Sequence, residues 1–491
     1  MSDPEAKCAA RLMEDKKQPP HVVIFPLPLR GHVNSMLQLA ELLALSGLKV
    51  TFLNSPHNHN HLPQFTDVPA RFTKFPGFEF RTVPDGLTDD HPRTGRFLLE
   101  MLDGMIVKTK PSLRDLLVNI NPPVDCIIGD GILGYVLDIG EELEIPVIQF
   151  RTISACCLWV YYRIPDLIGA GEIPVRGNED MDRLIKMVEG MENFLRGRDL
   201  PSFCRAKNLE VEGTRVQIFA QETRRSATAH ALILNTFEDL EGPILSHIRT
   251  KFPKIYTIGP LHAHLKTKLS EKNPVSSDSL NSIRKVDRSC ISWLDQQAMH
   301  SVVYVSFGSI AGLTREQLLE VWYGLVKSKV TFLWVVRPDS VLGHWVDEDV
   351  PVELMEGTKE RGYLVDWAPQ EEVLDHWAVG GFLTHSGWNS TLESVVAGVP
   401  MICWPQFADQ HVNSRYVSEV WKIGLDMKDF CDRHVVEKMV NDLMEEKRVE
   451  FVESARTMAK LAKESVSFGG SSYCNLDSLI EDIKLMSLKK S

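Results

Sequence analysis

The chain has few of the features that mark secreted, metal-binding or membrane proteins. Its nine cysteines are an odd number without C-x-x-C spacing. That pattern predicts reduced thiols, not a disulfide framework or a zinc site. Residues 1–20 lack the apolar segment of a signal peptide, and no apolar run is long enough for a membrane-spanning helix. We therefore expect a cytoplasmic protein without membrane insertion.

The sequence also lacks an excess of basic residues. Its formal net charge of −12 argues against nucleic acid or an anionic membrane as a partner. Of its 491 residues, 44% are hydrophobic and 24% are charged, which is an ordinary globular profile. This length is enough for two domains with sizeable cores.

Two catalytic motifs are missing. PLPLRGH follows the first predicted strand, where a dehydrogenase or an NAD-dependent epimerase would carry G-x-G-x-x-G. We find no G-x-S-x-G at a strand–helix turn, which an α/β hydrolase would need. The three alternate histidines of HNHNH, residues 57–61, stand in a predicted polar loop without a nearby carboxylate or cysteine. We therefore expect no metal site there.

Predicted strands and helices alternate along the chain. The predicted strands are HVVIFPLP, LKVTFLN, CIIGD, IPVIQF, ALILNTF and KIYTIG, followed later by SVVYVSFGS, TFLWVVRP, GYLVDW, GGFLTH and PMICWP. This alternation predicts an α/β protein with doubly wound parallel sheets. We expect the following division: a flexible tail at 1–20, an N-terminal domain at 21–261, a polar linker at 262–288, a C-terminal domain at 289–465 and a final helix at 466–491.

One dense run, from Trp367 to Gln410, combines several kinds of ligand chemistry. Within it GGFLTH predicts a buried strand and TLESVVAG predicts the helix that follows. Ser386 and Gly387 form the predicted turn, and Asn389 or Ser390 is a natural N-cap. Because a helix start presents unpaired N–H groups, a diphosphate binds there readily. The alternative interpretation is that these residues only cap a core helix.

Four further groups complete this run as a nucleotide-sugar site. His385, at the end of the predicted strand, can donate to phosphates, and Glu393 can accept from ribose hydroxyls. Asp409 and Gln410 form an acid–amide pair suited to sugar hydroxyls, while Trp367 offers a stacking surface.

The run resembles the donor-binding box of plant family 1 UDP-dependent glycosyltransferases. The similarity extends to GHVNSMLQLAELL, CIIGDGILGYVLDIGEELEIPVI, LILNTFEDLE, YTIGPL and SVVYVSFGSIAGLTREQLLEVWYGL, in the order of the family. The resemblance implies two Rossmann-like domains of the GT-B type, facing each other across a cleft. It also implies an inverting cytosolic enzyme with UDP-glucose as co-substrate and no metal or other cofactor. We further expect a monomer whose partners are UDP-glucose and a small-molecule acceptor.

The resemblance also implies the donor contacts. These are Thr152, Ser309, Trp367, Ala368, Gln370, His385, Gly387, Trp388, Asn389, Ser390, Glu393, Asp409 and Gln410. Arg151 and Phe407 are candidates for contact with the acceptor. Arg151 stands where the family usually has tryptophan, and it can pair with a substrate carboxylate or serve a structural role.

His32 and Asp130 are the candidate catalytic residues. Each follows or ends a predicted strand at the sheet edge where doubly wound proteins bind ligands. A carboxylate bonded to one imidazole nitrogen fixes the tautomer, so that the other nitrogen can act as a base. Taken singly, a Gly-His is often only a turn and a strand-end aspartate only a helix cap. The family carries its catalytic dyad at these two positions.

The chain departs from the family near this histidine. Ser35 replaces the usual proline, and Arg30 replaces the usual glutamine. We expect both changes to alter the mouth of the acceptor site. Segments such as VPDGLTDDHPRT look most like glucosyltransferases of iridoid and other monoterpenoid aglycones. A phenolic or flavonoid acceptor, or a non-catalytic nucleotide-sugar-binding protein, is the alternative.

Overall fold

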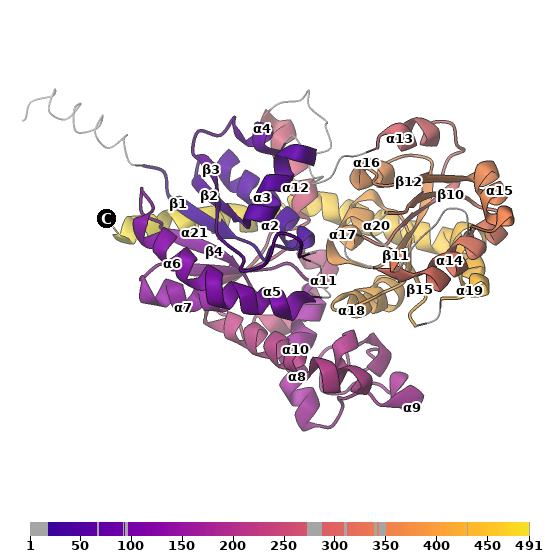
Figure 1. Ribbon diagram of the computed structural model, residues 1–491, viewed down its shortest axis with the longest axis horizontal. Coiled ribbons are helices and arrows are strands. Elements are labelled where there is room, and N and C mark those ends of the chain that lie inside the picture. Colours follow the sequence, from indigo (N-terminus) through magenta and orange to yellow (C-terminus); the bar gives the residue numbers. More distant parts are fainter. Residues whose placement is uncertain are drawn as a thin grey trace, which may run out of the picture.

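A computed structural model shows two parallel sheets, each covered by helices on both faces (Figure 1). It describes residues 18–65, 68–91, 93, 97–272, 287–308, 312–337, 341–342, 350–429 and 431–490. The predicted α/β class, with two doubly wound domains, is therefore confirmed. Most of the predicted tail, and part of the predicted linker, lie outside the described residues.

The first sheet has seven parallel strands. Their order is β3 (Phe78–Thr82), β2 (Lys49–Asn54), β1 (His21–Phe25), β4 (Cys126–Asp130), β5 (Val147–Arg151), β6 (Ala231–Leu234) and β7 (Ile255–Thr257). The central strands β1, β4 and β5 are buried along their whole length. Their continuous apolar runs suit a sheet covered on both faces.

The helices of the first domain follow its strands. They are α2 (Arg30–Leu45), α3 (Pro56–Phe65), α4 (Val68–Phe72), α5 (Leu98–Gly104), α6 (Lys110–Asn119), α7 (Tyr135–Glu142), α8 (Ala155–Gly169), α9 (Gly177–Met181), α10 (Ala206–Arg225), α11 (Glu238–Ile248) and α12 (Leu261–Lys272). In α2 nearly every residue from Met36 to Ala44 is buried, because this helix packs between β1, β2 and α12.

The second sheet has six parallel strands. Their order is β12 (Gly362–Val365), β10 (Thr331–Val335), β8 (Val302–Ser306), β13 (Val379–Thr384), β14 (Met401–Cys403) and β15 (Gly424–Asp426), and β9 (Leu313–Thr314) pairs separately with β11 (Val341–Leu342). The helices are α13 (Ser289–Leu294), α14 (Arg315–Ser328), α15 (Val352–Arg361), α16 (Gln370–Leu374), α17 (Trp388–Ala397), α18 (Gln410–Arg415), α19 (Arg433–Asn441), α20 (Arg448–Val466) and α21 (Ser471–Lys490).

The last two helices connect the two domains. Helix α20 packs against α17 in the second domain and against α11 and α12 in the first. Helix α21 then lies on β7, where Asn475 Nδ2 donates to the backbone oxygen of Thr257 over 3.1 Å (Figure 1). The chain therefore ends beside the sheet in which it began.

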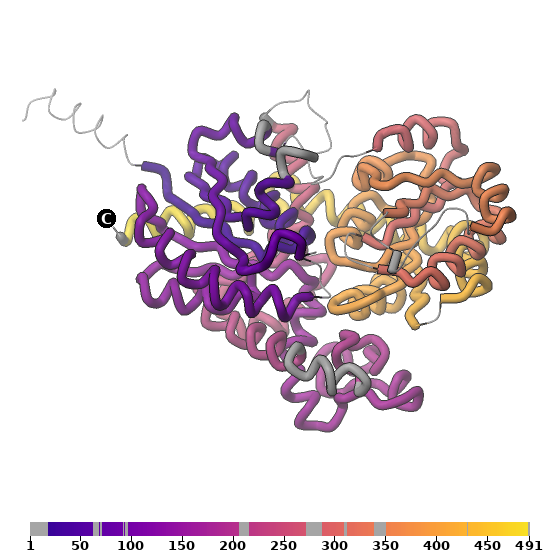
Figure 2. The backbone as a smooth tube through the Cα atoms, viewed as in Figure 1, coloured from indigo at the N-terminus to yellow at the C-terminus, as the bar shows by residue number. Residues whose placement is uncertain are grey.

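The segment between α8 and α10 extends from the first domain beneath the second (Figure 2). Its buried Asp199 forms an ion pair with Lys428 Nζ of the second domain, 2.9 Å away. Arg205 pairs with Asp429 over 2.7 Å. These contacts hold the segment against the donor side of the molecule.

Three local predictions were wrong. HNHNH lies in helix α3, not in a polar loop. The stretch predicted as a polar linker begins with α12, which packs on α2. The N-cap of α17 is Gly387, and Asn389 and Ser390 already lie inside the helix. Strands β3 and β15 were not predicted: β3 has no fully buried residue, and β15 has one buried residue of three.

Candidate functional site

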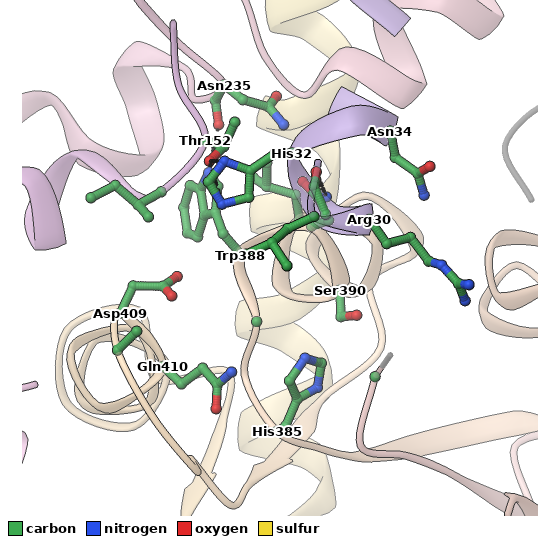
Figure 3. A pocket seen from close by; sticks show the side chains of 18 of the residues that line it. Arg30, His32, Asn34, Thr152, Asn235, His385, Trp388, Ser390, Asp409 and Gln410 are labelled. Atoms are coloured by element: carbon green, nitrogen blue, oxygen red, sulfur yellow. Dashed lines mark hydrogen bonds between the residues drawn. The ribbon is translucent and has the colours of Figure 1, made fainter. Parts of the chain in front are cut away.

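A cavity of about 320 Å³ opens between the carboxyl edges of the two sheets. Residues of both domains line it, including both candidate catalytic residues and the described donor candidates. In Figure 3 His32 and Thr152 lie on one side and His385 on the opposite side. Asp409 and Gln410 lie to the left in this view, and Arg30 extends to the right. The cavity volume of about 320 Å³ is in the range of small-molecule sites.

His32 and Asp130 form a direct pair. His32 Nδ1 lies 2.6 Å from Asp130 Oδ2. Asp130 also accepts from the backbone N–H groups of Leu27, over 3.1 Å, and Ile132, over 3.3 Å. Burial raises the pKa of Asp130, but the charge and hydrogen bond of His32, with those two N–H groups, outweigh it and hold the pKa below its ordinary value. The ionised carboxylate keeps the proton on Nδ1, so Nε2 is the nitrogen that can accept a proton.

Arg151, the last residue of β5, and Thr152, which follows it, differ in what they contact. Thr152 Oγ1 lies 3.0 Å from His32 Nδ1 and lines the cavity. Arg151 is buried, and its guanidinium donates to the backbone oxygen of Gly131 over 2.7 Å and to Thr223 Oγ1 over 3.3 Å. These bonds match the structural role considered for Arg151. They leave less of its guanidinium for a substrate carboxylate.

The start of α17 is a tight turn. Ser386 adopts the left-handed conformation, with φ 63°, and Gly387 ends the turn. The His385 ring lies against Gly308 and Gly387, and a Cβ on either glycine would come within 2.4 Å of Nε2. Burial and the positive charge of Arg337 lower the pKa of His385 to about 4. The imidazole is therefore neutral at pH 7, with one N–H, and the ring also hydrogen-bonds to the Ser306 backbone.

A hydrogen-bonded group lies beneath the expected nucleotide. Gln370 Nε2 donates to Ser390 Oγ over 2.9 Å and to Glu393 Oε2 over 2.6 Å. Tyr304 donates its hydroxyl to Gln370 Oε1 over 3.2 Å. Burial and the negative charge of Glu371 raise the pKa of Glu393 to about 8. This carboxyl therefore carries a proton near neutral pH.

The aromatic plate is in contact with the first domain. The guanidinium carbon of Arg30 lies 5.3 Å from the ring centroid of Trp367. Ala368 is buried beside it, and both residues line the cavity. Arg30, which we expected to alter the entry to the acceptor site, lines the cavity and contacts a donor candidate.

The acid–amide pair is held by its neighbours. Asp409 accepts from Asn413 Nδ2 over 2.8 Å, and burial raises the pKa of Asp409 to about 6. Gln410 Oε1 accepts from the backbone N–H groups of Gln406, over 2.8 Å, and Phe407, over 3.1 Å. Because the oxygen of Gln410 is occupied in this way, its NH₂ group is the part available to a sugar.

Contacts across the cleft involve residues that sequence reasoning did not identify. Trp388 donates its indole N–H to the backbone oxygen of Asn235 over 2.8 Å. Ser35 Oγ donates to Asn389 Oδ1 over 2.9 Å. No local motif marks Asn235 or Asn413, because Asn235 accepts from Trp388, 153 positions away, and Asn413 accepts from Ser154, 259 positions away. For Ser35 the departure from the family pattern was the only signal.

Two further findings concern the remaining candidates. Phe407 lines the cavity, and Ser309 lies outside the described residues.

Over the described ranges there is no group of three or more His, Cys, Asp or Glu side chains that could hold a metal ion. Within the same ranges no helix is both long and apolar enough to cross a membrane.

Residues 272–462 match the family described as UDP-glucoronosyl and UDP-glucosyl transferase. The chain is 55% identical to 7-deoxyloganetic acid glucosyl transferase from Catharanthus roseus, over 96% of this chain and 98% of the relative. It is 45% identical to myricetin 3-O-rhamnoside 1,2-glucosyltransferase from Crocosmia x crocosmiiflora, over 97% of this chain and 98% of that relative.

Among solved structures, the fold is similar to that of Os79 from O. sativa in complex with UDP. The TM-score is 0.79 and the identity 27%, over 94% of this chain and all of the other. Identity of 55% along nearly the whole length, together with this fold, shows the family. The chain belongs to the plant family 1 UDP-dependent glycosyltransferases and is a glycosyltransferase enzyme.

Proposed function

We propose that the protein moves glucose from UDP-glucose to a hydroxyl or carboxyl group of a small plant secondary metabolite, giving a β-glucoside. The favoured acceptor is an iridoid or other terpenoid aglycone. The observation that carries the proposal is the 2.6 Å pair of His32 and Asp130, set in one cavity with the donor candidates. The choice of acceptor rests on the 55% identity to a glucosyltransferase named for 7-deoxyloganetic acid.

In this proposal His32 is the general base. Its Nε2 takes the proton of the acceptor while the acceptor oxygen attacks the anomeric carbon. The bond from that carbon to the phosphate oxygen breaks, and UDP leaves with the electron pair. Attack opposite to UDP inverts the α-linked sugar to a β-glucoside. Asp130 stabilises the imidazolium that forms.

The donor lies on the second domain in this proposal. Trp367 stacks on uracil, Gln370 and the Ala368 backbone contact its edge, and Glu393 binds the ribose. The start of α17, with His385, Asn389 and Ser390, holds the diphosphate, whose charge favours a helix N-terminus. Asp409 and Gln410 bind the glucose. Residues 21–261 then form the acceptor-binding domain and residues 289–465 the donor-binding domain.

An acceptor screen tests the proposal. The purified protein is incubated with UDP-glucose and a panel of terpenoid, phenolic and carboxylic aglycones, and the products are identified by mass. We expect a mass gain of one hexose, with the highest kcat/KM on a terpenoid aglycone. Products on phenols alone would overturn the choice of acceptor. UDP binding without any product would favour the non-catalytic alternative.

A flavonoid acceptor is the second candidate. It is favoured by the 45% identity to a glucosyltransferase named for a myricetin rhamnoside. The same screen separates the two candidates if it includes flavonoid glycosides. We also propose that the protein is a monomer in the cytoplasm. Light scattering after size exclusion, and a fluorescent fusion in plant cells, test these two points.

A further inference from the structure

Ser35 lies one helical turn after His32 on α2, and its side chain is buried. Its Oγ lies 2.9 Å from Asn389 Oδ1 and 3.0 Å from the backbone oxygen of Gly31. Asn389 Nδ2 in turn donates to that same oxygen of Gly31 over 3.0 Å. The start of α2 in the first domain therefore contacts both polar atoms of the Asn389 amide.

These partners fix the orientation of the amide. A backbone carbonyl oxygen can only accept, so the amide atom that faces Gly31 must be the NH₂ group. The Asn389 oxygen then faces the Ser35 hydroxyl, whose single proton it shares with the backbone oxygen of Gly31. One N–H of Asn389 is used by Gly31, and the second is left for a ligand in the cavity that Asn389 lines.

We propose that Ser35 is a positioning residue for the donor diphosphate, acting through the Asn389 amide; this rests on the proposed function. Family members usually carry proline at this position, and proline has no hydroxyl to donate. Because His32 lies on the same turn of α2, the contact also links the catalytic base to the donor site.

Loss of the Ser35 hydroxyl should affect the binding of UDP but not of uridine. UDP carries the diphosphate that Asn389 is proposed to bind, and uridine does not. A neutral hydrogen bond contributes about 0.5–1.5 kcal/mol net, so Ser35→Ala should weaken UDP binding by about 2–10-fold. The affinity for uridine should stay the same. A role in stability alone would not separate the two ligands.

Calorimetric titration of UDP and of uridine tests this in the full-length protein. Ser46→Ala is the matched control, because Ser46 Oγ donates to Leu42 O on the same helix, over 2.9 Å, but lies far from the cleft. We expect weaker binding of UDP alone in Ser35→Ala and no change in Ser46→Ala. Unchanged UDP affinity in Ser35→Ala, or an equal loss for both ligands, would overturn the inference.

A double-mutant cycle gives a second test. In an Asn389→Ala background, Ser35→Ala should have no further effect on UDP affinity, because the group that it positions is gone. Additive effects would contradict the inference. The parent protein separates this inference from the proposed function: a parent that binds no UDP refutes the function, whereas a parent that binds UDP with additive variants refutes only the role of Ser35.

Discussion

The side-chain amide of Asn413 donates to the carboxylate of Asp409 over 2.8 Å, one turn along α18. The same Nδ2 donates to the backbone oxygen of Ser386 over 3.0 Å, and Asn413 Oδ1 accepts from Ser154 Oγ over 2.6 Å. The buried amide of Asn413 thus joins three parts of the site: Asp409, which we propose binds the sugar, the turn before α17, and the start of α8 in the first domain.

This contact predicts a defect that affects the sugar more than UDP. Asn413→Ala removes the donor that holds Asp409, and a hydrogen bond to a charged group is worth about 1.5–3 kcal/mol. We expect kcat/KM for UDP-glucose to fall by about 10–100-fold, with a smaller loss of affinity for UDP, because the same amide also donates to the turn before α17. Asn475→Ala is the control, since that amide joins α21 to β7 far from the cavity. An equal loss of UDP affinity would show that Asn413 supports the whole site.

Removing the proposed base should stop the chemistry and spare donor binding. His32→Ala is expected to lower kcat by about 10²–10⁴-fold, the usual contribution of a positioned base. Asp130→Asn should cause a smaller loss through the wrong tautomer. Steady-state kinetics with an alcohol acceptor and calorimetry with UDP measure the two effects. Near-normal turnover of His32→Ala on that alcohol would refute the assignment.

Gln410 is expected to set the preference for glucose. We expect its NH₂ group to donate to an equatorial hydroxyl of glucose. An axial 4-hydroxyl would leave buried groups unpaired, at a cost of about 1–3 kcal/mol. UDP-glucose should therefore exceed UDP-galactose in kcat/KM by about tenfold or more. Competition between the two donors measures this ratio, and parity in the parent enzyme would contradict the prediction.

Gln410 has two roles that can be separated: the proposed donor preference depends on its NH₂ group, and the support of the loop depends on its side-chain oxygen. It accepts from Gln406 and Phe407, so Gln410→Ala should lower both thermal stability and the donor ratio. Gln410→Glu keeps an acceptor for the loop but loses the N–H donors. We expect this second variant to narrow the donor ratio with a smaller change in thermal midpoint.

The raised pKa of Glu393 predicts how stability depends on pH. The folded protein keeps this proton up to about pH 8, whereas the unfolded chain loses it near the ordinary value of 4.5. Because the folded state binds more protons in that window, the Glu393 contribution to stability falls as the pH rises from 4.5 to 8. Glu393→Gln removes this contribution and can still accept from Gln370.

Thermal unfolding at pH 5.5 and pH 8.5 checks this prediction. Between these two values the midpoint should fall less in Glu393→Gln than in the parent. The thermal midpoint of Glu393→Gln should therefore rise relative to that of the parent at pH 8.5, where the buried carboxyl group of the parent has lost its proton. The same fall in both proteins would show that Glu393 does not titrate in this window.

Much of the fold could be predicted from the sequence, because its signals are local. CIIGD matches β4 residue for residue, and GGFLTH overlaps β13 except at its ends. Buried parallel strands are continuous apolar runs, so they show in the sequence without knowledge of their neighbours. The predicted polar linker failed for the opposite reason. Helix α12 is stabilised by packing on α2, and its own pattern is only weakly amphipathic.

The sequence by itself determined the residue types of the candidate site and the order of its motifs. Only the tertiary structure decided how those residues are held. His32 and Asp130 are 98 positions apart, and Ser35 and Asn389 are 354 apart, yet both pairs are in hydrogen-bond contact. A hydrogen bond depends on distance and direction in space, which local pattern does not encode. The sequence therefore showed Arg30 and Ser35 as departures from the family pattern. It did not show that Arg30 contacts Trp367 or that Ser35 contacts Asn389.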